Sequence, residues 1–218
     1  MPPAGVWGVP RCSSLPPIRL RRTPQEEWGP GGGKSAVSQP QEGSSMATME
    51  ELEAKLKRLE RELQVLKDIE AIKQLKGKYF RCLDCKLWDE LAECFAEDAT
   101  TSYSGGKYSF KGRDAIMKFF RESMTASMVS MHQGHHPEIE ITSETTAKGI
   151  WGFEDYLIIK QANMGLRGAA FYRDEYVKIK GQWKIKHTGY NRIFEEVWDR
   201  GETKSCKITA NMHEPCAE

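Results

Sequence analysis

The sequence lacks several features that would define its class at once. No apolar run approaches the ~20 residues that a membrane-spanning helix requires, which excludes a transmembrane protein. Neither charge sign dominates, because 32 basic and 31 acidic side chains leave a formal net charge of +1. That balance gives no electrostatic reason to expect nucleic acid or an anionic membrane as the main partner. Cysteine is scarce, with six in 218 residues, so we expect no disulfide framework and a reducing compartment, the cytoplasm.

Proline and glycine, by contrast, are concentrated in residues 1–45. This segment holds 8 of the 10 prolines and 7 of the 19 glycines, a composition that cannot support a packed core. We therefore predict a disordered, dispensable segment. Before Glu26 it carries four arginines and no acid: Arg11, Arg19, Arg21 and Arg22. That composition also fits a mitochondrial transit peptide, although the prolines would break the amphipathic helix that such a peptide forms.

A leucine-rich helical arm is predicted over residues 46–65, within a helix that runs from about 50 to 81. Its leucines alternate spacings of four and three, as in the a/d seam of a coiled coil, and charged residues flank them; they are Leu52, Leu56, Leu59, Leu63 and Leu66. Two interpretations stay open: the seam drives self-association into a homodimer or homotrimer, or it packs on its own domain. Residues 66–198 form the predicted domain, and residues 199–218 a polar tail.

Short helices and long strands make up the rest of the domain. An amphipathic stretch with Trp88, Leu91, Ala92 and Phe95 on one face precedes strands at 100–103 and 108–111 and a helix over 113–124. Four long strands follow, at 128–141, 145–159, 169–179 and 182–196, with a loop at 160–168. Helices mostly first and strands last predict an α+β fold, in which a cone-shaped, strongly curved, mostly antiparallel sheet packs against three helices. Such a cone encloses an apolar pocket that suits a small ligand.

Five polar residues are candidates for catalysis or ligand binding: Tyr79, Asp84, His132, His135 and Asp155. If the strands at 128–141 and 145–159 form a hairpin that turns near 143–144, residue 141 faces 146 and His132 faces Asp155. Facing side chains lie ~5 Å apart, so Asp155 can orient His132 and stabilise its charged form. Each residue also has a plain structural interpretation, as a core histidine, a packed tyrosine or a helix cap. Asp155 carries the most weight, because a carboxylate within an apolar strand is costly to bury without a partner.

The sequence gives no sign of a metal or cofactor. His132, His135 and His136 are spaced like a metal cluster, but in a strand 132 and 136 share one face and 135 points to the other. Cys82 and Cys85 have redox spacing without the surrounding thioredoxin pattern. Dinucleotide and phosphate loops and a nucleophile elbow are absent. We therefore expect cofactor-free chemistry and no bound metal.

Three segments together resemble the SnoaL-like branch of the nuclear-transport-factor-two-like superfamily. They are Tyr79-x4-Asp84 after a helix, His132-Gln-Gly-His-His-Pro-Glu-Ile-Glu-Ile141, and Gly149-Ile-Trp-Gly-Phe-Glu-Asp155. The resemblance covers about residues 66–198. It implies the cone fold with a pocket that serves scytalone dehydratase, steroid isomerases, polyketide cyclases, the bile-acid 7-alpha-dehydratase and non-catalytic binding modules. The resemblance implies that Tyr79, Asp84, His132 and Asp155 match the site residues of the dehydratases. It also implies that a pocket arginine of the family falls near Arg192.

Two hypotheses follow. In the first, the protein is a cofactor-free dehydratase or isomerase of a small, apolar, ring-containing carbonyl compound. His132 takes the α-proton, Asp155 holds the imidazole, Tyr79 donates to the enolate oxygen, and Asp84 orients Tyr79 or shapes the mouth of the pocket. The substrate-binding candidates are His135, Arg192, Trp151 and Tyr172. In the second, the chain is a non-catalytic binding or assembly module. An enzyme requires the polar side chains to converge on an empty apolar cavity, whereas a module would disperse or seal them.

Overall fold

The computed structural model describes residues 47–202 and residue 213. The prediction of a disordered, dispensable segment at 1–45, and most of the predicted polar tail, lie outside the described residues. Within the described part, no helix is long and apolar enough to cross a membrane.

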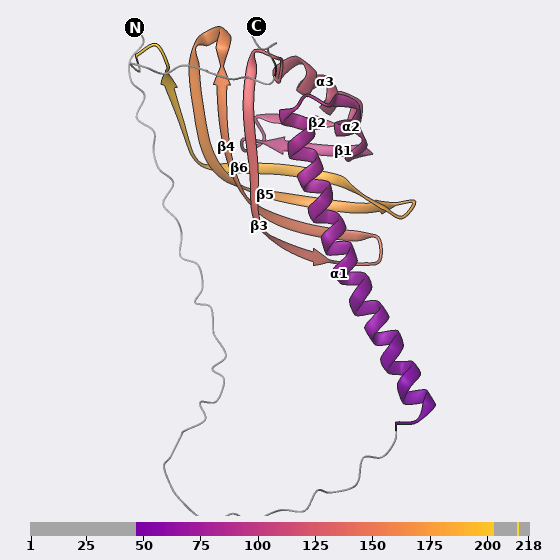
Figure 1. Cartoon of the computed structure of the whole chain (residues 1–218). Coiled ribbons are helices and arrows are strands. Elements are labelled where there is room, and N and C mark those ends of the chain that lie inside the picture. Colours follow the sequence, from indigo (N-terminus) through magenta and orange to yellow (C-terminus); the bar gives the residue numbers. More distant parts are fainter. Residues whose placement is uncertain (1–46, 203–212, 214–218) are drawn as a thin grey trace, which may run out of the picture. The chain divides into compact units, whose positions relative to one another are not determined.

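A single long helix, α1 (Met49–Asp84), opens the described chain. Thr48 caps it: the Thr48 hydroxyl accepts from the backbone N–H of Glu51, and the Glu51 carboxylate accepts from the backbone N–H of Thr48. The predicted arm and the first domain helix are therefore one continuous element. Its N-terminal half extends past the sheet, whereas its C-terminal half lies against it (Figure 1).

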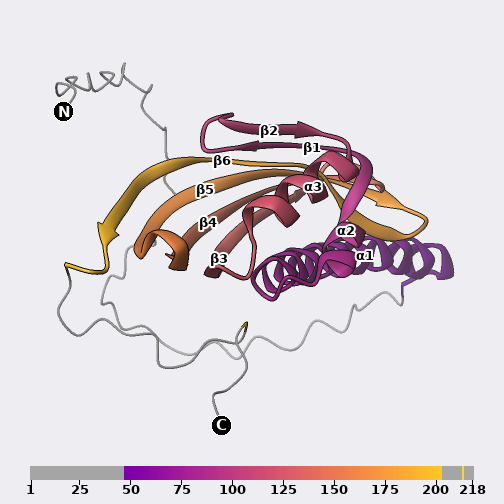
Figure 2. The same cartoon turned by 90° about the horizontal axis from the view of Figure 1, so that it is seen from above.

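Two short helices and six strands complete the domain. In chain order they are α2 (Trp88–Glu93), β1 (Phe95–Tyr103), β2 (Tyr108–Lys111), α3 (Arg113–Ser123), β3 (Met128–Ile141), β4 (Thr146–Ile159), a 3-10 turn η1 (Lys160–Ala162), β5 (Met164–Ile179) and β6 (Gln182–Asp199). The sheet order is β2-β1-β6-β5-β4-β3. All pairs are antiparallel except β1 with β6. The sheet arches over α1 and α3 (Figure 2), and its edges do not close into a barrel, so the predicted α+β cone is confirmed.

The register predicted for the β3–β4 hairpin is right at the site and wrong at the turn. His132 pairs with Asp155 as expected, but Ile141 pairs with Ala147 rather than with residue 146. A bulge between His135 and Glu138 absorbs the difference, and His136 within it has a positive φ of 42°. An extra residue on one strand of a pair shifts the register beyond it by one, so the bulge restores the predicted pairing farther along.

Two other boundaries differ from the prediction. The expected loop at 160–168 is only the short turn η1, and β5 begins at Met164. Phe95, expected on the second helix, already belongs to β1 and is fully buried. Both differences come from tertiary pairing, which recruits residues of weak local preference into the sheet.

The core between α1 and the sheet holds a buried ion pair. Lys76 Nζ donates to Asp174 Oδ2 at 2.7 Å, and neither side chain is exposed. The hydroxyl of Tyr176 donates to the same oxygen at 2.7 Å, and Trp151 Nε1 donates to the Tyr176 hydroxyl at 2.9 Å. Burial lowers the pKa of Lys76, and the neighbouring Asp174 carboxylate opposes that shift. The pair and its hydrogen bonds tie α1 to the middle of the sheet.

Candidate active site

An apolar cavity of about 520 Å³ is lined by residues of α1, α3 and the inner face of the sheet. That volume falls within the ~300–1,000 Å³ range of small-molecule sites. Its apolar wall includes Leu83, Phe120, Met124, Met128, Leu157 and Leu166. The polar side chains on the wall come from five tyrosines and from His132, Asp155 and Arg192 among others. Tyr79, His132 and Asp155 thus converge on an apolar cavity, as the enzyme hypothesis requires, whereas Asp84, the fourth residue of that hypothesis, is not among the lining residues.

Asp84 at the end of α1 is the hydrogen-bond partner of His132. Asp84 Oδ1 lies 2.6 Å from His132 Nδ1, and Asp84 Oδ2 accepts from the backbone N–H of His132 at 2.8 Å. The hydroxyl of Ser130 also donates to Asp84 Oδ1, at 2.7 Å. A carboxylate only accepts, so it places the imidazole proton on Nδ1 and leaves Nε2 free to take a proton. This is the orientation that a histidine general base needs.

His132 and Asp155 face each other as predicted, but the carboxylate of Asp155 is hydrogen-bonded to Arg192 and not to the imidazole of His132. Arg192 donates to both oxygens of Asp155, at 2.6 and 2.7 Å. Burial disfavours the charge of Arg192, but the hydrogen bond and the attraction of Asp155 outweigh burial and raise the pKa of Arg192. Asp155 and Arg192 form a bidentate ion pair on the cavity wall. Both oxygens of Asp155 are therefore bonded to Arg192, and Asp84 is the carboxylate that bonds to His132.

Gly168 explains how Arg192 reaches Asp155 across an intervening strand. Gly168 pairs with Asp155 on one side, and β6 lies on the other. A Cβ atom at Gly168 would lie 2.7 Å from Arg192 Nη1 and 2.9 Å from the carbonyl oxygen of Phe194. The missing side chain is therefore the gap through which the guanidinium crosses β5.

Tyr79 lies on the cavity wall together with a second tyrosine that the sequence did not single out. The hydroxyls of Tyr79 and Tyr103 are 3.1 Å apart, and both rings are buried. Burial raises the pKa of Tyr79 and of Tyr103 well above the usual range of a phenol. Both phenols therefore stay protonated near neutral pH, and the phenol that accepts in this pair keeps its own proton to donate to an oxygen in the cavity. The predicted contact of Asp84 with Tyr79 is replaced by the Asp84–His132 pair.

The remaining predicted binding residues divide between the cavity and other places. Tyr172 and Arg192 line the cavity. Trp151 belongs instead to the buried network around Asp174, and His135 packs beside His136, so neither lines it. Tyr190 on β6 is a cavity residue that the sequence reasoning missed. The available signal was the spacing: Tyr190 lies two residues after Thr188 in a predicted strand, so the two side chains share the inner face.

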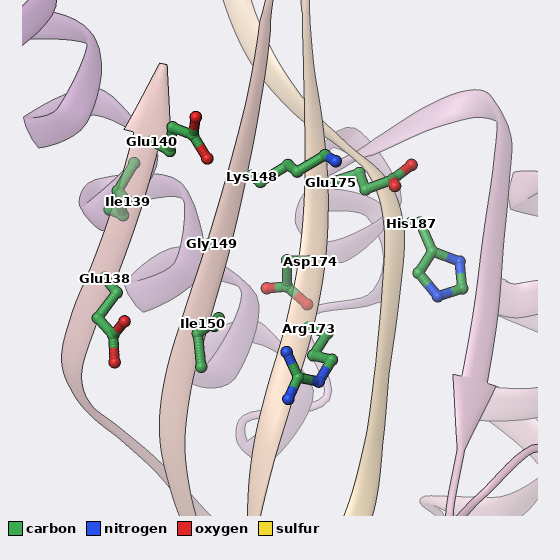
Figure 3. A pocket seen from close by; sticks show the side chains of 10 residues that line it. All are labelled: Glu138, Ile139, Glu140, Lys148, Gly149, Ile150, Arg173, Asp174, Glu175 and His187. Atoms are coloured by element: carbon green, nitrogen blue, oxygen red, sulfur yellow. The ribbon is translucent and has the colours of Figure 1, made fainter. Parts of the chain in front are cut away.

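A second hollow, of about 500 Å³, is lined by different residues of the sheet (Figure 3). Charged side chains of both signs dominate it, including Glu138, Glu140, Lys148, Arg173 and Glu175. None of the predicted site residues lines it. Within residues 47–202 and at residue 213, no three potential metal-ligating acids, histidines or cysteines gather at one point. The apolar cavity is therefore the better candidate for an active site.

A curved sheet backed by helices around a cavity, with His132 on the wall of the cavity and held by the Asp84 carboxylate, is an architecture of the nuclear-transport-factor-two-like class. The model of the SnoaL-like domain matches residues 64–189, more than half of the chain. The protein belongs to the SnoaL-like domain family.

Solved structures agree with this assignment. A candidate scytalone dehydratase from Novosphingobium aromaticivorans is 26% identical, with a TM-score of 0.57 over 61% of this chain and 89% of that chain. A type 3 hexachlorocyclohexane dehydrochlorinase from Novosphingobium barchaimii is 20% identical, with a TM-score of 0.58 over 63% of this chain and 94% of that chain. At that identity, the second likeness supports the fold alone.

Proposed function

We propose that this protein is a cofactor-free dehydratase or isomerase that removes the proton α to the carbonyl of a small, apolar, ring-containing compound. The observation that carries the proposal is the 2.6 Å contact between His132 Nδ1 and Asp84 Oδ1 beside an apolar cavity of about 520 Å³. A base that is oriented by a buried carboxylate, and flanked by protonated phenols, suits enolate chemistry. The likeness to a candidate scytalone dehydratase supports the same reaction class.

The reaction can be written with the groups present. His132 Nε2 takes the α-proton, and the electron pair of the C–H bond moves toward the carbonyl, so that an enolate forms. Tyr79 donates to the developing enolate oxygen, and Asp84 stabilises the imidazolium by its charge. For a β-hydroxy carbonyl compound, the enolate then expels the β-oxygen, which leaves as water after His132 returns its proton. If the proton returns to another carbon instead, the same steps give an isomerisation.

The experiment is α-proton exchange into heavy water, followed by mass spectrometry over a panel of β-hydroxy ring ketones. The parent protein should exchange at least one ketone and convert a β-hydroxy compound with the loss of water. The matched control is His135→Ala, which removes a histidine of the same strand outside the cavity and should exchange as fast as the parent. If ring ketones bind and none exchanges in the parent, the protein is a binding module rather than an enzyme.

Asp84→Asn and Asp155→Asn should have different kinetic signatures. Asp84→Asn removes the charge that stabilises the imidazolium, so kcat should fall by about 10²–10⁴-fold with little change in KM. Asp155→Asn breaks the ion pair with Arg192 on the cavity wall and should act mainly on KM. Steady-state kinetics on the first ketone that is turned over provides the comparison. If Asp155→Asn lowered kcat and Asp84→Asn changed mainly KM, Asp155 rather than Asp84 would be the carboxylate that stabilises the His132 imidazolium.

Tyr79→Phe should lower kcat by about 10²–10³-fold, because it removes one hydrogen-bond donor to the enolate oxygen. The ring and its packing are kept, so the protein should still fold, with a stability lower by about 1–3 kcal/mol because the buried Tyr103 hydroxyl loses its partner. Tyr156→Phe is the matched control, since that tyrosine is 43% exposed and absent from the cavity wall. A change in KM alone for Tyr79→Phe would mean that the hydroxyl acts only in binding.

We also propose that the protein self-associates as a homodimer or homotrimer. Apolar side chains on the outside of the domain support this, among them Met131, Phe171, Ile193 and Val197, which are each about half exposed. An apolar surface of this kind is characteristic of protein interfaces. Light scattering at micromolar concentration tests the proposal, and a monomeric mass would contradict it.

A further inference from the structure

The leucine seam of α1 is uncovered along its whole length. Its six apolar side chains are between 46% and 72% exposed, although α1 is continuous with a well-packed domain helix; they are Met49, Leu52, Leu56, Leu59, Leu63 and Leu66. The first contacts of α1 with the rest of the domain come just beyond the seam, where Asp68 accepts from Lys178 and Trp183. The interpretation that the seam packs on its own domain is therefore wrong.

The seam also points away from the domain. The buried face of α1 follows Asp68, Ile72, Lys76, Tyr79 and Leu83. At 3.6 residues per turn, the seam is rotated by roughly 170° from that face. The domain therefore cannot cover the seam by closing on the arm, and a molecule that docks on the seam does not meet its own domain. In Figure 1 the same half of α1 extends beyond the sheet.

The charges beside the seam show what kind of partner fits it. With leucines at the a and d positions, Lys55 and Glu62 occupy g positions, and Glu60 and Lys67 occupy e positions. In a parallel pair each g residue lies beside the e residue of the next heptad of the other helix. Lys55 then meets Glu60 of a second copy, and Glu62 meets Lys67 of a second copy. Every such pair is attractive, and symmetry forms each pair twice.

An antiparallel arrangement of the same leucine layers fits less well. There, e residues face e residues, so Glu53 meets Glu60 of the second copy, and this repulsion occurs twice. The attraction of Lys55 for Glu62 across the other flank also forms twice and about offsets it, so these charges give the antiparallel pair no net attraction. Beyond Leu66 the seam direction carries Glu70, Lys73 and Gly77 instead of leucine, which ends the apolar contact where the domain begins.

We propose that the seam Met49–Leu66 binds a second copy of this chain as a parallel, in-register, two-stranded coiled coil. This inference deepens the self-association proposed above, and it is independent of the chemistry at His132. Two and a half heptads form a short coiled coil. Because none of the seam residues belongs to the core of the domain, each domain remains folded without this contact. The two domains then lie at the same end of the pair, each on the outer side of its own helix.

Sedimentation velocity of the full chain from 0.1 to 100 µM tests the seam. Leu59→Glu places two carboxylates in one core layer and should convert dimer to monomer throughout this range. Ala54→Glu adds the same charge on the opposite side of the helix, just over one turn from Leu59, and should leave the mass unchanged. Thermal melting controls for folding, because Leu59 lies outside the core cluster. A Leu59→Glu variant that stays dimeric would overturn the proposal and move the interface to the domain.

Charge exchange tests the orientation. Glu60→Lys turns two attractive pairs of the parallel dimer into repulsive ones and should raise the dimer dissociation constant roughly tenfold. The double variant Lys55→Glu with Glu60→Lys restores both attractions and should recover the parent value. In an antiparallel pair, Glu60→Lys would relieve the repulsion by Glu53 and tighten the dimer, which would overturn the parallel assignment. If the parent is a monomer and becomes a dimer when residues 1–45 are removed, that segment covers the seam and the proposal is wrong.

Discussion

His132→Ala is expected to slow α-proton exchange by about 10²–10⁴-fold or more, because it removes the general base and leaves water as the acceptor. The substitution should spare the fold. Asp84 keeps its hydrogen bonds from Ser130 and from the backbone N–H of residue 132, so the cost in stability is about one hydrogen bond, ~1 kcal/mol.

Chemical rescue sharpens this experiment. The truncated side chain leaves a space beside Asp84, and added imidazole that enters it should restore part of the exchange rate. His132→Gln keeps an amide donor to Asp84 but no base, so it should be as inactive as the alanine variant. If His132→Ala exchanges at the parent rate, the base is a different group and the proposed mechanism is wrong. A parent protein without exchange activity would instead count against the reaction class.

Lys76→Met is expected to lower the free energy of unfolding by about 3–5 kcal/mol, because it leaves Asp174 buried without its cation. Asp174 Oδ1 has no hydrogen-bond partner, and Oδ2 would keep only the Tyr176 hydroxyl. Lys76 Nζ also lies 3.6 Å from the centre of the Tyr172 ring, so its loss loosens one wall of the cavity. Urea unfolding of the described domain measures the change.

The matched control is Lys78→Met, two residues along the same helix. Its partner Glu93 is 64% exposed, and an exposed pair contributes only ~0–1 kcal/mol. Adding Asp174→Asn to the Lys76→Met variant removes the buried charge and should recover part of the lost stability. A Lys76→Met protein as stable as the Lys78→Met protein would show that the buried pair contributes little beyond its volume.

Local patterns were enough to predict the curved α+β sheet and the facing of His132 and Asp155. Alternation along β3 and β4 and a turn between them set the register, and the bulge at His136 corrected the error of one residue at the turn. The resemblance to the SnoaL-like branch is confirmed by the family match over residues 64–189.

The partners of those residues could not be predicted, because they depend on contacts between distant segments. Asp84 reaches His132 only because the end of α1 packs against β3, and from the sequence an aspartate at a helix end is more simply a cap. The Asp155–Arg192 pair spans three strands and depends on Gly168 in the middle one. Tyr103 reaches the cavity because β1 pairs in parallel with β6, a pairing that a chain of hairpins does not indicate.

Gly168 has a consequence for the order in which this family can vary. A Cβ atom at that position would collide with the guanidinium of Arg192 and lie 2.9 Å from the carbonyl oxygen of Phe194, so a larger residue at 168 requires both the replacement of Arg192 and a shift of β6. If Arg192 is lost first, however, the Asp155 carboxylate is left on an apolar wall without its cation. The three positions therefore form an epistatic set, in which Asp155 must become neutral before either of the other two can change. Relatives that carry a side chain at position 168 should therefore lack both Arg192 and Asp155, and their cavities then favour ligands of a different polarity.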